Sequence, residues 1–365
     1  MSAALYPLET AFRAALSICR RRPAPPTDLL LCTVDHFEPH MGGASDDIAY
    51  RRTADWLERF PRIRKAHRDS AGCMPAHTLF YPWDEFEPGA FEQICDFCRA
   101  GNAEVEIHLH HENDTEAGLR QKLQQAIGHY TAGGALARWP DGKPAFAFIH
   151  GNWALNNSRI EAGRNYCGVQ NETDVLWEEG CYADFTFPAW KKTSQPRQVN
   201  SIFYAHAGAR PGKPHDRGVR ARRGHAPPPG LMIVSGPLTP YADANSGRLK
   251  LGMDDGDLAA TFRFKRDRIS RWLGAGIHVM GRPDRLFIKL HCHGAPDANR
   301  EMLLGSDLDA LYTAAGELTA PGSGYRIHYV TARQMFNVIR ATELDLPGPV
   351  ESLRDAVLQR PAFAG

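Results

Sequence analysis

The chain has 365 residues, which allows one large α/β domain or two domains of ordinary size. Its 43 Lys and Arg side chains nearly balance its 42 Asp and Glu side chains, so no overall charge attracts it to nucleic acid or to an anionic membrane. No apolar run approaches the ~20 residues that a membrane-spanning helix needs, so we expect no transmembrane segment.

The eight cysteines are scattered along a chain that shows no secretory signal. This pattern is typical of proteins from a reducing compartment. We therefore expect free thiols and a cytoplasmic location.

Residues 1–28 are predicted to form an N-terminal helix and a lead-in to the first strand. After them, apolar runs with strand character alternate with stretches of helical spacing, as expected for a parallel α/β architecture. The predicted strands are 29–34, 77–81, 105–109, 145–149, 183–187, 231–235, 286–290 and 327–330. The predicted helices between them are 47–60, 89–100, 115–130, 173–179 and 258–273.

This number of strands fits a barrel of about seven or eight strands better than an open nucleotide-binding sheet, because the glycine-rich phosphate-binding fingerprint is missing. We assign residues 29–345 to a single catalytic barrel domain and residues 346–365 to a C-terminal tail. Residues of about 195–230 break the pattern with prolines, arginines and glycines, and we interpret them as a long loop or insertion.

The predicted strand 105–109 leads into a run rich in imidazole and carboxylate groups, which is the chemistry of a metal site. Alternation along a strand places His108 and His110 on the same face. The spacing from His110 to Asp114 can place two metal ligands on one turn that leaves the strand. Three ligands are enough for a catalytic ion, which keeps one position open for water or substrate.

The first predicted strand, 29–34, ends in a similar way, with Asp35 and His36 directly after it. Active sites of parallel α/β folds form at the carboxyl ends of strands, so we expect this segment to meet the segment of His110. One member of the Asp35–His36 pair would hold the metal, and the other would accept a proton from activated water. These residues alone do not show which of the two holds the metal and which accepts the proton.

A third strand end carries His291 and His293, directly after residues 286–290. Alternation places the two histidines on one face. We expect at least one of them to enter the same mouth as the metal, where it could protonate a leaving group.

A fourth strand end, after residues 145–149, carries His150, Asn152 and Trp153. The polar side chains can form hydrogen bonds with a substrate, and the ring of Trp153 can stack on a sugar. A place in the core explains Trp153 equally well. With this reservation, we assign the three residues to substrate binding.

In the order and spacing of these motifs over residues 29–294, the chain resembles the polysaccharide deacetylase superfamily. These are metal-dependent enzymes, built on a distorted (β/α)7 barrel, that remove acetyl groups from sugars. The family's first motif, Thr-Phe-Asp-Asp, is similar to residues 33–36 here, which implies that Asp35 is the catalytic base and His36 a metal ligand. The second motif, His-x-x-x-His, is similar to the segment from His110 to Asp114, with Asp in place of the second His.

The remaining motifs of the family fall at later strand ends. The third falls at residues 150–153, without its usual arginine, and the fourth supplies an aspartate where Asp184 lies. The late motif with the catalytic histidine resembles residues 290–293, which implies that His291 or His293 is the proton donor. The resemblance thus implies a metal set of His36, His110 and Asp114, and Asp184 as a further substrate-binding residue.

We therefore expect a metal-dependent hydrolase that deacetylates an acylated sugar or a related carbohydrate amide or ester. It would hold a divalent metal ion, for which zinc is the best match. One alternative is a metal-independent glycoside hydrolase that uses carboxylates such as Glu38, Asp35 or Asp184. Another is a carbohydrate-binding protein that has kept the fold and lost catalysis.

Overall fold

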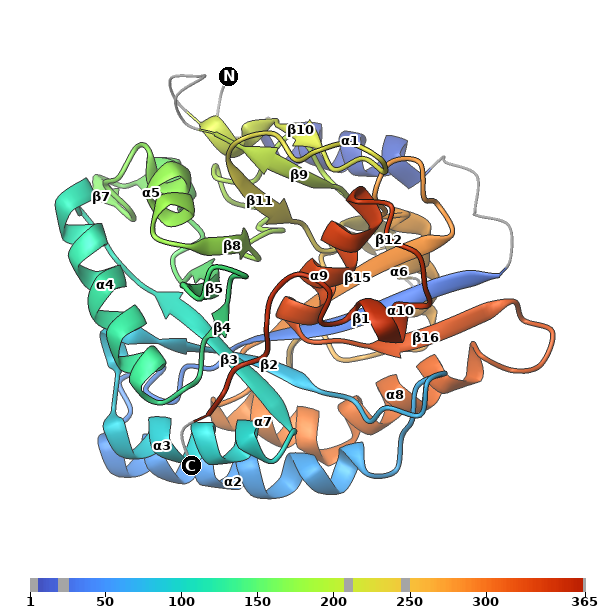
Figure 1. The fold of residues 1–365 in the computed structure, drawn as a ribbon, viewed down its shortest axis with the longest axis horizontal. Helices are drawn as coiled ribbons and strands as arrows, with labels where there is room; N and C mark the ends of the chain where they lie inside the picture. The colour runs from blue at the N-terminus through green and yellow to red at the C-terminus, as the bar shows by residue number, and fades with distance from the viewer. Residues whose placement is uncertain (1–5, 19–25, 207–212, 244–249, 364–365) are drawn as a thin grey trace.

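A computed structural model describes residues 6–18, 26–206, 213–243 and 250–363 of the chain. It shows a mixed α/β fold in which helices are arranged around a mostly parallel central sheet (Figure 1). This confirms the α/β class that the alternation of strand and helix patterns predicts.

The central strand is β1 (Thr27–His36), which is buried along its whole length. It pairs in parallel with β15 (Arg285–Cys292) on one side, and with β2 (His77–Pro82) and β16 (Tyr325–Tyr329) on the other. The other strands are β3 (Ala103–Leu109), β4 (Ala137–Arg138), β5 (Pro144–His150), β6 (Ile160–Glu161), β7 (Arg164–Asn165), β8 (Cys181–Asp184), β9 (Ile202–Ala205), β10 (Val219–Arg220), β11 (Leu231–Val234), β12 (Thr239–Asp243), β13 (Lys250–Asp254) and β14 (Asp257–Leu258).

The main sheet runs in the order β10-β9-β11-β8-β5-β3-β2-β1-β15-β14. Within the described residues this pairing is an open path, so it does not include the closure that a complete barrel requires. Strands β9 and β10 run antiparallel at one end of the path. Both come from 195–230, the segment predicted as an insertion, of which residues 207–212 lie outside the described residues.

The helices cover the sheet on more than one side, and α2, α3, α7 and α8 lie together along one side in Figure 1. At the start of α3, Glu87 accepts hydrogen bonds from the N–H groups of Gly89 and Ala90. Thr331 and Gln334 form a capping box at the start of α9. The helices are α1 (Tyr6–Ile18), α2 (Asp46–Arg64), α3 (Pro88–Arg99), α4 (Glu116–Ala132), α5 (Glu172–Glu178), α6 (Asp267–Ala275), α7 (Asp297–Met302), α8 (Leu308–Glu317), α9 (Ala332–Glu343) and α10 (Val350–Leu353).

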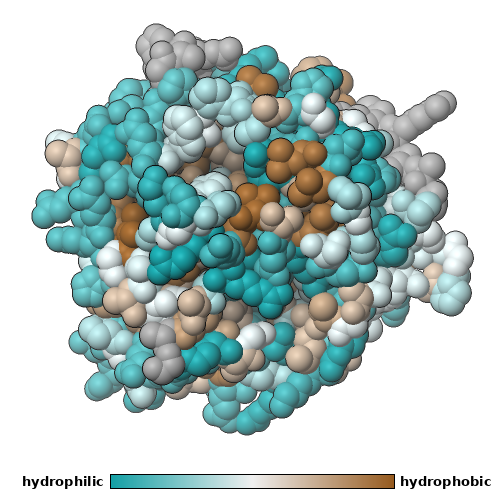
Figure 2. Space-filling model, viewed as in Figure 1, coloured by the Kyte–Doolittle hydropathy of each residue, from teal (hydrophilic) through white to brown (hydrophobic). Residues whose placement is uncertain are grey.

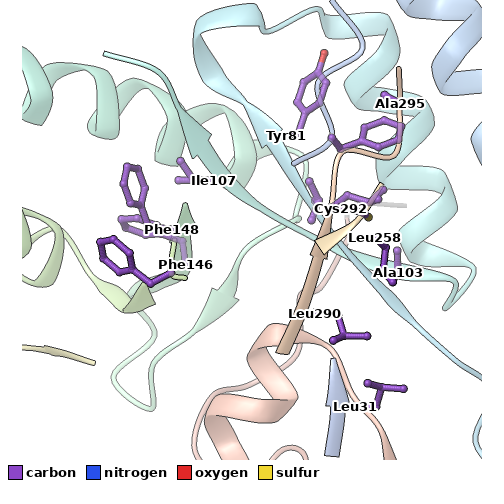
Figure 3. Close-up of a cluster of buried hydrophobic side chains, with 14 of the residues drawn as sticks. Leu31, Tyr81, Ala103, Ile107, Phe146, Phe148, Leu258, Leu290, Cys292 and Ala295 are labelled. Atoms are coloured by element: carbon purple, nitrogen blue, oxygen red, sulfur yellow. The ribbon is translucent and has the colours of Figure 1, made fainter. Parts of the chain in front are cut away.

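The two faces of the sheet carry different hydrophobic clusters. Leu31 of β1 belongs to a cluster that includes Trp56 of α2, and we call this the outer face. Leu30 belongs to a second cluster, on what we call the inner face. Figure 3 shows part of the outer-face cluster, with the rings of Phe146 and Phe148 beside each other. This alternation of faces decides where the polar residues at the strand ends point.

The molecular face in Figure 2 is mostly hydrophilic, with hydrophobic residues gathered in small groups. None of the helices in the described part of the chain is long and apolar enough to cross a membrane. Its cysteines, as far as the chain is described, are free thiols, and all except Cys73 are buried.

Candidate functional site

Five side chains meet where β1, β3 and β15 end, and we call this group the central cluster. Its members are His36, Glu38, His108, His110 and His293. The parallel register brings these strand ends to the same edge of the sheet. The group therefore assembles where parallel α/β folds place their active sites.

Glu38 is the member that connects the others. Its Oε1 lies 3.0 Å from Nε2 of His108 and 2.9 Å from Nε2 of His110, and its Oε2 lies 3.7 Å from Nε2 of His293. Two groups of possible metal ligands share Glu38, one with His108 and His110 and one with His36 and His293. The side chain of Glu38 is 6% exposed and that of His110 is 27% exposed, so the cluster is reachable from solvent at His110.

The imidazole rings of the central cluster are packed against each other. His36 stacks on His293 with 4.6 Å between ring centroids, and its ring lies 5.0 Å from that of His108. Nδ1 of His36 and Nδ1 of His108 are buried, with no hydrogen-bond partner among the described residues. Buried polar atoms nearly always have a partner in a native protein, so these two nitrogens are open to a further hydrogen-bond partner.

Asp84, in the short helix η2 (Trp83–Glu85), fixes the ring of His110. Its Oδ1 accepts the backbone N–H of His110 at 2.8 Å, and its Oδ2 lies 3.0 Å from Nδ1 of the same residue. Nε2 of His110 is thereby directed towards Glu38, an arrangement that is typical of metal-binding histidines. The position of the His110 ring also requires a glycine at residue 151, because a Cβ on Gly151 would lie 2.3 Å from Nε2 of His110.

The electrostatics of the central cluster favour an ionised Glu38 beside a neutral His36. Burial alone would raise the pKa of Glu38, but hydrogen bonds with His108 and His110 hold it well below its usual value. Burial and repulsion from His293 and His108 hold the pKa of His36 well below its usual value. Burial also opposes a charge on His110, but hydrogen bonds to Asp84 and Glu38 raise its pKa to about 10.

Trp153 lies at the edge of the central cluster, and its partly buried side chain also packs against the outer-face hydrophobic cluster. Its ring centroid is 5.4 Å from that of His36 and 5.6 Å from that of His293. Its φ of 47° is in the left-handed region, which is strained for a bulky residue and is often found at functional sites. Asn152 has a different role, because its Nδ2 donates to the backbone carbonyl of His111 at 3.3 Å and so connects two loops.

The two predicted proton donors differ in position. The side chain of His293 is 15% exposed and belongs to the central cluster. His291 is deeper, with its ring 6.2 Å from His36 and its Nε2 3.9 Å from Oδ1 of Asp257. Of the two, His293 is the more exposed.

A second group of side chains takes in His150, which the sequence pattern assigns to substrate binding. We call this group the lateral cluster, and its members are His111, His150, Cys167 and Glu172. All four are buried, so His150 does not line the mouth at His36. The strand register explains this position, because His150 pairs with Leu109, which belongs to the outer-face cluster.

Asp114, which was predicted to share a metal ion with His36 and His110, lies beside the lateral cluster instead. Its Oδ2 is 3.3 Å from Nδ1 of His111 and 2.6 Å from Nζ of Lys122. The structure therefore does not assemble the predicted ligand set. The turn after β3 sends the side chains of successive residues to different sides, which residue spacing alone does not reveal.

Asp35 lies on the outer face of the sheet and is not a member of the central cluster. Its Oδ1 accepts the backbone N–H of Gly294 at 2.6 Å, and its Oδ2 lies 3.4 Å from Nε2 of His77. The carboxylate is 0% exposed. Because neighbouring residues of a strand point to opposite faces, β1 itself separates Asp35 from the ring of His36. Asp35 thus links β1 to the segment after β15 and is not positioned as the catalytic base.

Asp184, the aspartate supplied by the fourth motif of the resemblance, is also buried. Its carboxylate accepts the hydroxyl of Thr186 at 2.6 Å and the backbone N–H of Thr186 at 3.2 Å. Burial raises the pKa of Asp184 to about 7. These local bonds give Asp184 a role in the turn after β8 and not in contact with a substrate.

Several members of the two clusters were not among the predicted site residues. His108 could have been found from its alternation with His110, and Glu38 from its place two residues after His36. Glu172 and Cys167 carry no such signal, because they come from a loop and a helix start far from the strand ends in sequence.

Comparison with known proteins gave no match to a protein-family model and no match to a curated protein.

Proposed function

We propose that this protein is a metal-dependent hydrolase that removes an acyl group from a sugar or from a related carbohydrate amide or ester. The observation that carries the proposal is the central cluster, in which imidazoles and a carboxylate from three strand ends meet around Glu38. The resemblance of the motif order to the polysaccharide deacetylases supports the substrate class. It also supports a related barrel, although the strand pairing described above is open.

The residues of the central cluster fit a divalent transition-metal ion. Imidazole nitrogen and carboxylate oxygen are the ligands that zinc prefers in catalytic sites, where three protein ligands leave one position open. Glu38, His108 and His110 form the set with the closest donor atoms, and the bond from Asp84 to His110 supplies the orientation that such ligands need. We infer that these three residues hold the ion and that zinc is the best match.

The remaining residues would handle protons and substrate. When bound, the ion supplies Lewis acidity towards an acyl carbonyl and makes water a stronger acid. His36, with a buried and unpartnered Nδ1, is placed to accept a proton on the inner face. His293, which stacks on His36 and reaches solvent, is placed to donate a proton to the leaving amine or alkoxide. The ring of Trp153 would stack on the sugar beside them.

Metal analysis of the purified protein, together with acetate release from a panel of N- and O-acetylated sugars, tests this proposal. We expect acetate release that a chelator abolishes, together with a loss of bound metal in His110→Ala. His36→Ala should keep the metal and lose activity. His225→Ala is the matched control, because this exposed histidine belongs to neither cluster and should change nothing.

Two results would count against the proposal. One is a His110→Ala variant with unchanged metal content and activity. The other is cleavage of glycosidic bonds that a chelator does not affect, which would favour the alternative of a metal-independent glycoside hydrolase.

A further inference from the structure

The lateral cluster gathers four metal-binding side chains from four separate segments. His111 follows β3, His150 ends β5, Cys167 lies in the loop before α5, and Glu172 is the first residue of α5. Their exposed fractions are 4% for His111 and 0% for the other three. Charged and polar groups this deeply buried need partners, so the arrangement calls for an explanation.

The donor atoms of the lateral cluster lie about as close together as the ligands of one ion, and the two oxygens of Glu172 face different members. Oε1 of Glu172 lies 3.0 Å from Nε2 of His111 and 3.8 Å from Nε2 of His150, and Oε2 lies 3.3 Å from Sγ of Cys167. Tetrahedral zinc with ordinary bond lengths separates neighbouring ligand atoms by roughly 3.3 to 3.7 Å. One donor atom from each of the four residues lies within 4.8 Å of all the others.

Nε2 of His150 is an independent sign of a ligand. It is fully buried, it faces Glu172, and it has no hydrogen-bond partner among the described residues. Nδ1 of the same ring accepts the backbone N–H of Asn152 at 3.2 Å, at the long end of the hydrogen-bond range. An ion at Nε2 would move the ring proton to Nδ1, so we expect this one contact to open on binding.

The surroundings of His111 and Cys167 resemble those of metal ligands. Nδ1 of His111 faces the carboxylate of Asp114 at 3.3 Å, the second contact that orients a ligating histidine. Sγ of Cys167 accepts the backbone N–H groups of Asn157 at 3.3 Å and Val169 at 3.4 Å. Hydrogen bonds to sulfur of this kind stabilise a ligating thiolate.

The backbone around the lateral cluster is held in unusual conformations. Asn113, Asn156 and Asn157 have φ values of 47°, 56° and 53°, in the left-handed region. A Cβ on Gly168 would lie 2.3 Å from the backbone N of Asp114, so only glycine allows these two loops to touch. Such conformations persist only where the surrounding structure fixes them.

We propose that the lateral cluster is a second metal site, bound by His111, His150, Cys167 and Glu172, with zinc as the best match. Four protein ligands and complete burial make it a closed, structural site, in contrast to the open central cluster. Its ion fixes the turn at residues 110–114 and so holds His110 in position for the central cluster. The evidence for this site does not depend on the proposed hydrolase activity, because it is confined to the lateral cluster.

Replacement of the bound metal by cobalt gives a test that separates this cluster from the central cluster. A thiolate bound to cobalt absorbs in the near ultraviolet, and the central cluster has no sulfur ligand. We expect the metal-free full-length protein to gain this band as it binds cobalt, and to bind two ions per chain. His110→Ala should keep the band and bind one ion fewer, whatever the outcome for hydrolase activity.

Two alanine variants assign the sulfur. Cys167→Ala should lose the band, while Cys292→Ala, which removes the thiol beside Asp35 and His77, should keep it. Absence of the band in the wild-type protein would overturn the proposal and leave the lateral cluster as a buried ion pair of His111 with Glu172. A band that survives in Cys167→Ala would overturn it equally. The wild-type measurement decides the matter even if a variant fails to fold.

Discussion

His110 and His111 are adjacent in the sequence, but their side chains enter different clusters. Nε2 of His110 lies 2.9 Å from Oε1 of Glu38, and Nε2 of His111 lies 3.0 Å from Oε1 of Glu172. The segment that leaves β3 therefore contributes to both groups. A change in the position of His111 should therefore move His110 as well, because one peptide bond joins the two residues.

The carboxylate of Asp84 should set the metal affinity of the central cluster. Asp84→Asn weakens the contact that orients His110, and loss of such a contact typically lowers metal affinity by about 10- to 100-fold. Metal titration of the variant measures the change. Asp96→Asn, at an exposed position on α3, is the control and should bind metal as the wild-type protein does.

Gly151→Ala should damage the central cluster and leave the fold intact. The added Cβ would lie 2.3 Å from Nε2 of His110, so the ring must move away from Glu38. We expect loss of the ion of the central cluster and of activity, with an unchanged circular dichroism spectrum. Gly128→Ala is a matched control, since its Cβ meets nothing within 4 Å and should stabilise α4 by about 0.5–1 kcal/mol. Full metal binding in Gly151→Ala would contradict the position that we assign to His110.

Asp35→Asn should affect stability more than chemistry. Its carboxylate is buried between Gly294 and His77, and weakening such a bond costs about 1–3 kcal/mol of unfolding free energy. Urea unfolding measures this loss, and metal analysis should show that the central cluster keeps its ion. If the variant were fully stable but inactive, Asp35 would be the catalytic base that the family resemblance implies.

Trp153→Ala should weaken substrate binding without loss of metal. The indole ring borders His36 and His293, and loss of a stacked ring costs about 0.5–1.5 kcal/mol, or up to about 10-fold in KM. Trp177→Ala is a suitable control because that side chain is on α5 and 43% exposed. Equal KM values for the two variants would exclude a role of Trp153 in stacking on the sugar.

Asp28 belongs to neither cluster, and its carboxylate should make the free energy of unfolding depend on pH in acid. Burial would raise its pKa, but hydrogen bonds with His328 and Arg326 lower it from 3.8 to about 2. A carboxylate with a lowered pKa in the folded state stabilises the protein above its unfolded pKa, and this contribution is lost as the pH falls through the folded value. We expect Asp28 to contribute on the order of 2 kcal/mol at neutral pH, lost between about pH 4 and pH 2.

Unfolding of Asp28→Asn and wild-type protein at about pH 6 and about pH 2.5 measures this contribution. The difference in unfolding free energy between the two proteins should shrink at the lower pH. A difference that stays constant with pH would show that Asp28 does not make this pH-dependent contribution to stability.

Part of the candidate site could be predicted from residue patterns. The apolar runs before His36, His110 and His293 identify parallel strands, and such strands end at one edge of a sheet. Asp114 could not be placed in this way, because it belongs to a turn whose direction depends on contacts with distant residues. His150 ends β5, and its face depends on the register with β3, which local periodicity does not give. Asp35 was misplaced because the strand was predicted to end at residue 34, whereas β1 continues to His36 and puts these two neighbours on opposite faces.

The sequence by itself determined the α/β class, the strand ends that carry imidazole groups, and the shared face of His108 and His110, because these follow from local periodicity. Only the tertiary structure decided that Glu38 contacts His108 and His110 and that Glu172 and Cys167 join His111. Those contacts connect residues far apart in the chain, and the packing of loops against the sheet edge brings their side chains together.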